Sequence, residues 1–96
     1  MRVAVLDGGC IKSKDELHAC LAEQMELPGH YGANLDALWD MLTGWVRMPL
    51  TVRWLQYDLC RERLGEDCEH VLQLFREAEQ ELPGFTLIIE GADTRK

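Results

Sequence analysis

The sequence predicts an α/β protein with a small three-stranded parallel sheet packed by helices. Three short apolar runs, at residues 2–6, 50–55 and 85–89, have the length and composition of strands. Helical segments with recognisable start and stop residues separate these runs. Strands that alternate with helices favour a parallel sheet, and right-handed crossovers place the helices over it.

The first strand and helix are delimited by turn and capping residues. The Val-rich run at residues 2–6 leads into Asp-Gly-Gly at residues 7–9, which is turn chemistry. Ser13, with Glu16 three residues later, is a capping box, and apolar side chains follow it at helical spacing. Leu-Pro-Gly at residues 27–29 ends this first helix.

The middle of the chain predicts a short helix followed by a strand. Asn34 is a good N-cap for a helix that runs to about Thr43, with Gly44 as its C-terminal breaker. Pro49 precedes the second strand, at the start of which a proline is tolerated. We expect one or two helical turns over residues 56–64.

The last third predicts the clearest helix and the third strand. Apolar side chains recur at helical spacing over residues 67–82, and Pro-Gly at 83–84 ends the helix. The near-continuous apolar run at residues 85–89 favours a strand buried on both faces. We expect residues 1–90 to form one domain and residues 91–96 a flexible tail.

Charge and composition exclude several classes of function. The chain has 96 residues and a net charge of −7, which disfavours direct binding to nucleic acid and favours a cationic partner. No secretory signal and no membrane-spanning run is visible, so we expect a cytoplasmic protein. Its four cysteines should then be reduced, buried or half-buried thiols. Their spacing and the scattered histidines predict no metal and no cofactor.

The segment HYGANLDALWDMLTGW at residues 30–45 is the most informative part of the chain. On the helix that it contains, Asp36 and Asp40 lie one turn apart on the face opposite the leucines, with Trp39 at the rim. Two such aspartates repel each other, and a partner that brings Arg or Lys would relieve them. The simpler interpretation is a solvated acidic face with a tryptophan that packs on the sheet.

Catalysis is a third interpretation of the same residues. Asp36 and Asp40 with His30 could form a small acid–base site, although no nucleophile or phosphate-binding motif accompanies them. A catalytic pair should lie in a concave pocket, whereas the carboxylates of a binding surface should lie on a convex helix.

The sequence resembles the barstar family of intracellular ribonuclease inhibitors. The resemblance rests on residues 30–45, 46–54 and 71–78 and on the spacing between them. It implies a three-stranded parallel sheet packed by helices, a cis peptide between Met48 and Pro49, and an inhibitory surface made by the acidic helix and the loop before it. It also implies an immunity protein or antitoxin that has no enzymatic activity, is monomeric when free, and binds a basic ribonuclease.

The resemblance assigns roles to individual residues. Asp40 would be the main phosphate mimic, Asp36 would pair with a nearby basic group, and Glu77 would add a peripheral acidic contact. The partner-binding residues implied in this way are His30, Tyr31, Gly32, Asn34, Asp36, Trp39, Asp40, Thr43, Gly44, Trp45 and Glu77.

Two positions depart from the family pattern. His30 stands where the family has a tyrosine that stacks on the enzyme, and Ala33 stands where it has an acidic residue. A protonated His30 facing a cationic active site would weaken binding. These departures favour an alternative, in which the same fold binds another basic protein that is not a barnase-type ribonuclease.

Overall fold

A computed structural model describes residues 2–90, and these form three strands and four helices. The tail predicted for residues 91–96 lies outside the described residues. In chain order the elements are β1 (Arg2–Asp7), α1 (Lys14–Met25), α2 (Leu35–Gly44), β2 (Leu50–Leu55), α3 (Tyr57–Leu64), α4 (Glu66–Glu81) and β3 (Phe85–Ile89).

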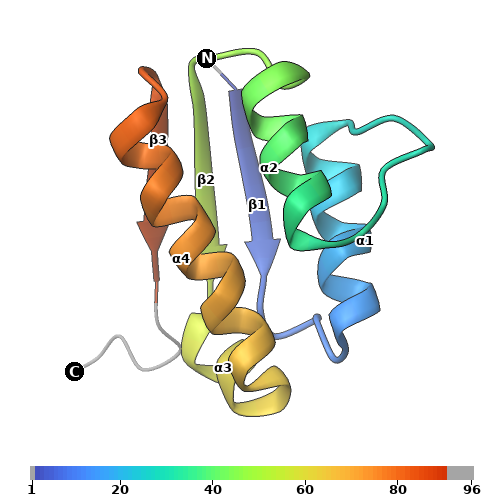
Figure 1. The fold of residues 1–96 in the computed structure, drawn as a ribbon. Helices are drawn as coiled ribbons and strands as arrows, with labels where there is room; N and C mark the ends of the chain where they lie inside the picture. The colour runs from blue at the N-terminus through green and yellow to red at the C-terminus, as the bar shows by residue number, and fades with distance from the viewer. Residues whose placement is uncertain (1, 91–96) are drawn as a thin grey trace.

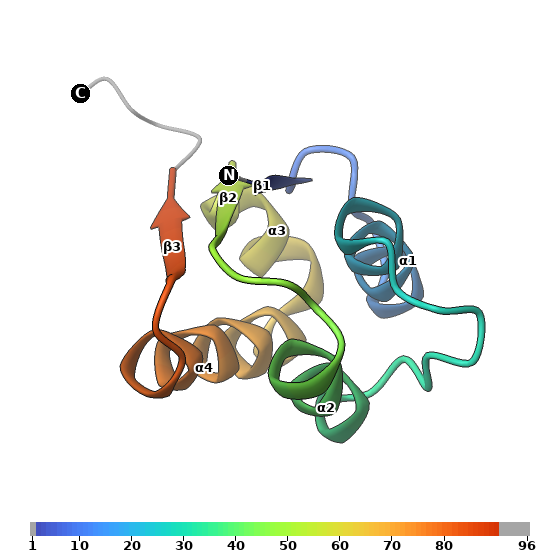
Figure 2. The same cartoon turned by 90° about the horizontal axis from the view of Figure 1, so that it is seen from above.

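The strands form a parallel sheet, as the sequence predicted, and their order in the sheet is β1-β2-β3. In the register of the sheet, Val52 on the central strand is opposite Ala4 on one side and Leu87 on the other. Consecutive strands are neighbours, and α2 and α4 lie on the same face of the sheet (Figures 1 and 2). Two right-handed crossovers that advance in the same direction place their helices on one face in this way.

The sheet has one covered and one open face, which corrects the prediction for the third strand. Burial alternates along β3, so Phe85 and Leu87 are buried while Thr86 is exposed and Ile88 is 41% exposed. The prediction of burial on both faces was wrong because all the crossover helices pack on one side. Val3, at 50% exposure on β1, lies on the same open face.

The core lies between the sheet and the helical layer. Trp54 of β2 and Phe75 of α4 are fully buried and meet edge to face, with ring centroids 6.1 Å apart and planes at 81°. Leu38 and Leu42 bury one side of α2 against this core. Such aromatic pairs add to the free energy that burial of their area supplies. The position of α2 is therefore fixed by apolar packing on the face away from its aspartates.

The helix ends follow the predicted capping residues with two differences. Ser13 Oγ accepts from the Glu16 amide at 3.1 Å, but the Glu16 carboxylate accepts from the Lys12 amide rather than from Ser13. Gly44 is the last residue of α2 and not its breaker, since Trp45 is the C-cap. Gly65, with φ of 62°, separates α3 from α4 in a conformation that favours glycine.

Three further expectations can be compared with the structure. The Met48–Pro49 peptide is cis, as the resemblance implied. All four cysteines are free thiols, but Cys10 is exposed, contrary to the expectation that all would be buried or half-buried. Within residues 2–90 no helix has the length and apolar character that crossing a membrane requires.

Candidate functional site: an acidic surface on α2 and α4

The acidic surface consists of Asp36, Trp39 and Asp40 on α2 together with Glu77 on α4. Burial of Leu38 and Leu42 leaves both aspartates on the solvent side of α2, where both are exposed. Glu77 is exposed on α4, the helix packed beside α2. Segments far apart in the sequence thus bring three carboxylates to one side of the molecule.

These carboxylates have no partner in the described part of the chain. Between residues 2 and 90, no hydrogen bond or ion pair reaches the side chains of Asp36, Asp40 or Glu77. The glutamates in ion pairs are elsewhere, at Glu26, Glu69, Glu79 and Glu90. An arginine or lysine brought by a partner could form charge-assisted hydrogen bonds with the three free carboxylates without first displacing an internal cation.

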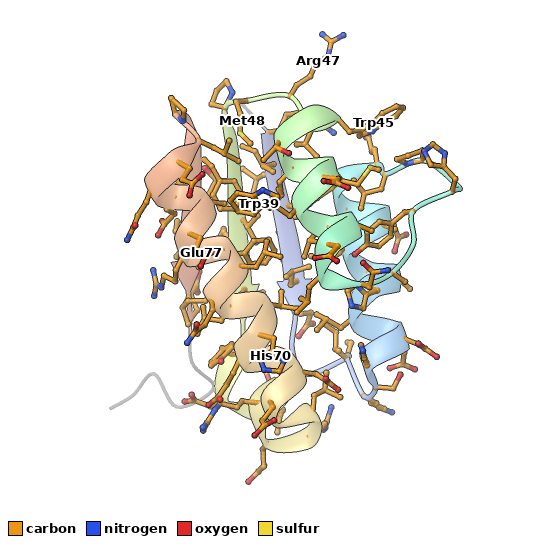
Figure 3. The ribbon with its side chains drawn as sticks, viewed as in Figure 1. Trp39, Trp45, Arg47, Met48, His70 and Glu77 are labelled. Atoms are coloured by element: carbon orange, nitrogen blue, oxygen red, sulfur yellow. The ribbon has the colours of Figure 1, made fainter. Side chains whose placement is uncertain are left out.

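Trp39 lies between the two helices at the edge of a hollow (Figure 3). It is half-buried, so its ring packs on the core while part of it faces solvent. The hollow has a volume of about 370 Å³. We call it the α2–α4 hollow, and it is lined by Leu35, Asp36, Trp39, His70, Gln73, Leu74 and Glu77. A tryptophan at the rim of an acidic hollow is typical of an anchor in a protein interface.

Sequence reasoning missed His70 and Gln73, which line this hollow with Glu77. His70, Gln73 and Glu77 are spaced i, i+3 and i+7, which puts them on one side of α4. Helical spacing counted back from Glu77 could therefore have identified His70 and Gln73 from the sequence.

The hollow also bears on the catalytic interpretation of Asp36 and Asp40. Asp36 lines this hollow but Asp40 does not, so the hollow is not a pocket shared by the two aspartates.

The loop before α2 is attached to α1 through Tyr31. The Tyr31 hydroxyl lies 2.6 Å from Nδ1 of His18, and which of them donates depends on the imidazole tautomer. Burial raises the pKa of Tyr31 to about 12. Burial is also the main reason that the pKa of His18 is lowered, with Lys14 contributing in the same direction. The half-buried Tyr31 thus directs its hydroxyl inward, whereas neighbouring His30 is exposed.

Residues 32–34 give the loop its shape. The Asn34 side chain accepts from the Ala37 amide at 2.8 Å, capping α2, and donates to the Gly32 carbonyl at 3.3 Å. Ala33 has a φ of 55°, a left-handed conformation that L-residues with a Cβ rarely adopt. Asn34, predicted as a partner-binding residue, therefore has a clear structural role as a cap.

The C-terminal end of α2 presents a small, open patch. Thr43 Oγ1 donates to the Trp39 carbonyl at 2.9 Å, and Trp45 Nε1 donates to the Glu26 carbonyl at 3.2 Å. A Cβ added at Gly44 would meet nothing within 4 Å, so the fold itself does not require glycine there. Glycine at an exposed helical position costs about 1 kcal/mol relative to alanine, and it leaves room for close approach by another molecule.

The predicted residues therefore divide into groups. Asp36, Trp39, Asp40 and Glu77 come together in the acidic surface, and the patch of Thr43, Gly44 and Trp45 continues from it along α2. The loop of His30, Tyr31, Gly32 and Asn34 lies before the N-terminus of the same helix. Across residues 2–90, no cluster of three or more His, Cys, Asp or Glu side chains is placed to hold a metal ion.

Comparisons with known proteins agree with this architecture. Residues 1–94 match the family described as "Barstar (barnase inhibitor)". The chain is 41% identical over 91 residues to a protein of Bacillus subtilis (strain 168) named "Putative ribonuclease inhibitor YrdF", and the alignment covers 94% of this chain and 100% of that relative. The three-stranded parallel sheet and the acidic helix packed on it are those of a barstar-like protein. The chain belongs to the barstar family, and the family description names an inhibitor rather than an enzyme.

Proposed function

We propose that this protein inhibits a basic ribonuclease by inserting its acidic surface into the cationic active site of the enzyme. A ribonuclease cleft is lined by basic side chains that hold RNA phosphates, and carboxylates can occupy the same positions. Asp40 acts as the main phosphate mimic, Asp36 pairs with a neighbouring basic group, and Glu77 contributes from the side. The protein blocks access and catalyses no reaction.

The observation that carries this proposal is the set of exposed carboxylates on one side of α2 and α4 that have no partner among residues 2–90. They are accompanied by the half-buried Trp39 and by a net charge of −7, which speeds the encounter with a basic partner. The printed description of the family and the name of the relative both refer to ribonuclease inhibition. Asp40 is exposed and does not line the hollow, which suits insertion into a cleft of the partner.

The direct test is RNA cleavage by barnase titrated with this protein at low and moderate salt. We expect cleavage to fall to zero near one equivalent of inhibitor, with association slower at the higher salt because steering is screened. Full cleavage at a large excess of inhibitor would overturn the proposal for barnase-type enzymes. Size-exclusion chromatography of the free and bound protein tests the accompanying proposal of a free monomer.

A second candidate is an interaction module of the same fold that binds another basic protein. It is favoured by exposed His30 and by Ala33, which removes one negative charge from the start of α2. A panel of unrelated ribonucleases separates the two candidates, since the first requires inhibition of at least one. An immunity or antitoxin role in the cytoplasm belongs to the first candidate, and protection of cells that express the inhibited ribonuclease tests it.

A further inference from the structure

A second hollow lies at the end of α2, next to the acidic surface. It has a volume of about 360 Å³ and brings together the start of β1, the end of α1 and the connection from α2 to β2. We call it the arginine hollow, and it is lined by Arg2, Met25, Glu26, Trp45 and Arg47. Two guanidinium groups against one carboxylate leave it with a net positive charge, in a chain whose overall charge is −7.

Arg47 differs from the other arginines of the chain segment 2–90. Arg2 pairs with Glu26 at 3.2 Å, Arg53 with Glu90, Arg61 with Glu69, Arg76 with Glu79, and Arg63 donates to the Gly9 carbonyl. Within that segment, Arg47 has neither a hydrogen bond nor an ion pair. It is exposed and extends away from the body of the molecule (Figure 3). Its guanidinium is therefore available to a partner.

Trp45 lines the arginine hollow and belongs to the patch at the C-terminal end of α2. Its indole N–H donates to the Glu26 carbonyl, and this bond holds a side chain that is 53% exposed. Tryptophan and arginine are the side chains most enriched among residues that dominate binding energy at interfaces. An exposed Trp45 beside Arg47, which has no partner among residues 2–90, has the composition of such a contact.

We infer that the arginine hollow accepts an aspartate or glutamate side chain of the same ribonuclease that the acidic surface binds. This inference rests on the proposed function and adds a requirement on the partner. The ribonuclease must carry an acidic group beside its cationic cleft, at a separation set by the length of α2. Guanidinium binds carboxylate in a planar, two-hydrogen-bond geometry, which makes Arg47 more selective than a lysine would be there.

The charge pattern explains what such a site would contribute. Carboxylates near the start and middle of α2, followed by a free arginine after its end, match only a surface with the reverse pattern. A basic protein without the acidic group would leave Arg47 facing positive charge, and like charges in contact reduce affinity. The arginine hollow therefore determines which basic proteins are bound, while the acidic surface supplies the main attraction.

The first experiment tests the arginine hollow without a ribonuclease. Tetraglutamate peptide is titrated into ¹⁵N-labelled protein at low salt, and the Trp45 indole N–H resonance is followed by NMR. We expect a saturable shift at millimolar peptide in the wild type and none in Arg47→Glu. No shift at Trp45, or the same shift in Arg47→Glu, would overturn the inference.

Lys12→Glu is the matched control because it makes the same change in net charge. Lys12 is exposed and lies beyond the C-terminal end of β1, whereas Arg47 precedes the N-terminal end of β2. Since β1 and β2 are parallel neighbours, the two side chains lie at opposite ends of the sheet. Lys12→Glu should keep the wild-type shift at Trp45. Loss of that shift in Lys12→Glu would show that the response depends on net charge and not on the arginine hollow.

The second experiment measures inhibition of barnase by the wild type, by Arg47→Glu and by Lys12→Glu. We expect Arg47→Glu to raise the inhibition constant by about tenfold and Lys12→Glu by less than about twofold at moderate salt. Equal inhibition by all three would overturn the contact with the ribonuclease. If the wild type fails to inhibit barnase, the proposed function fails for that enzyme, and the peptide titration alone still decides whether the arginine hollow binds carboxylate.

Discussion

The Tyr31 hydroxyl and the His18 imidazole form a 2.6 Å hydrogen bond that joins the loop before α2 to helix α1. The His18 side chain is almost completely buried, at 2% exposure. The bond therefore satisfies a group that would otherwise be buried without a partner. It also limits how far the loop can move, which matters because that loop precedes the candidate binding helix.

Removing the Tyr31 hydroxyl should destabilise the protein. Tyr31→Phe leaves His18 Nδ1 without its partner, and we expect the free energy of unfolding in urea to fall by about 1–2 kcal/mol. Tyr57→Phe is the matched control, because Tyr57 is buried and its hydroxyl makes no hydrogen bond within residues 2–90. Equal losses in the two variants would show that the hydrogen bond to His18 contributes nothing specific.

The free energy of unfolding should decrease as the pH falls below 6.5, the ordinary pKa of histidine. Burial lowers the pKa of His18 from 6.5, so between 6.5 and the lowered value the unfolded chain binds a proton that the folded protein does not. The free energy of unfolding then decreases with falling pH, and the loss ends below the lowered pKa. Urea unfolding measured from pH 8 to pH 5 tests this, with His18→Gln as the variant that should lose this part of the slope.

The free energy of unfolding should also decrease at alkaline pH, where Tyr31 ionises. Burial raises the pKa of Tyr31 from 10.0 to about 12, so between these values the folded protein retains a proton that the unfolded chain loses. The corresponding contribution to stability is present below pH 10 and is lost as the pH rises toward about 12. Tyr31→Phe should remove this part of the alkaline slope, whereas Tyr57→Phe should remove only the separate contribution of Tyr57, whose pKa is also raised by burial.

Asp40 should dominate inhibition. Asp40→Asn keeps the size and helical position of the side chain but removes its charge, and we expect the inhibition constant for the cognate ribonuclease to rise by at least about 100-fold. Asp36→Asn and Glu77→Gln should raise it less. Urea unfolding of all three variants should match the wild type, because none of these side chains has an internal partner in residues 2–90. An unchanged inhibition constant for Asp40→Asn would contradict the assignment of the site.

Gly44 should show opposite effects on stability and on binding. A methyl group at this exposed helical position meets nothing in the fold, so Gly44→Ala should raise the free energy of unfolding by about 0.5–1 kcal/mol. If the ribonuclease approaches this patch closely, the same methyl group should weaken inhibition. A variant that is more stable and inhibits as well as the wild type would exclude Gly44 from the interface.

Much of the fold was predictable because its signals are local. The cap at Asn34, the helical spacing of Leu38 and Leu42, and the apolar run of β2 each follow from nearest neighbours in the chain. These same local signals placed Asp36 and Asp40 on the exposed face of α2. The alternation of strands with helices predicted the parallel sheet, the family resemblance added the cis peptide at Met48–Pro49, and the structure has both.

The errors came from features that depend on the whole molecule. An apolar run such as β3 does not reveal whether helices cover one or both faces of its sheet, so the exposure of Ile88 was missed. Similarly, Gly44 has the composition of a helix breaker, yet packing of α2 on the core extends the helix through it.

The elements, their order along the chain and the acidic face of α2 follow from the sequence alone, because helix periodicity and capping act within a few residues. The residues that lie beside that face depend instead on tertiary packing. Packing of α2 against α4 brought His70 and Glu77 to the hollow beside Trp39, and the return of the chain to β2 put Trp45 and Arg47 near Arg2. These neighbours are far apart in the chain, and only burial of a common apolar core brings them together.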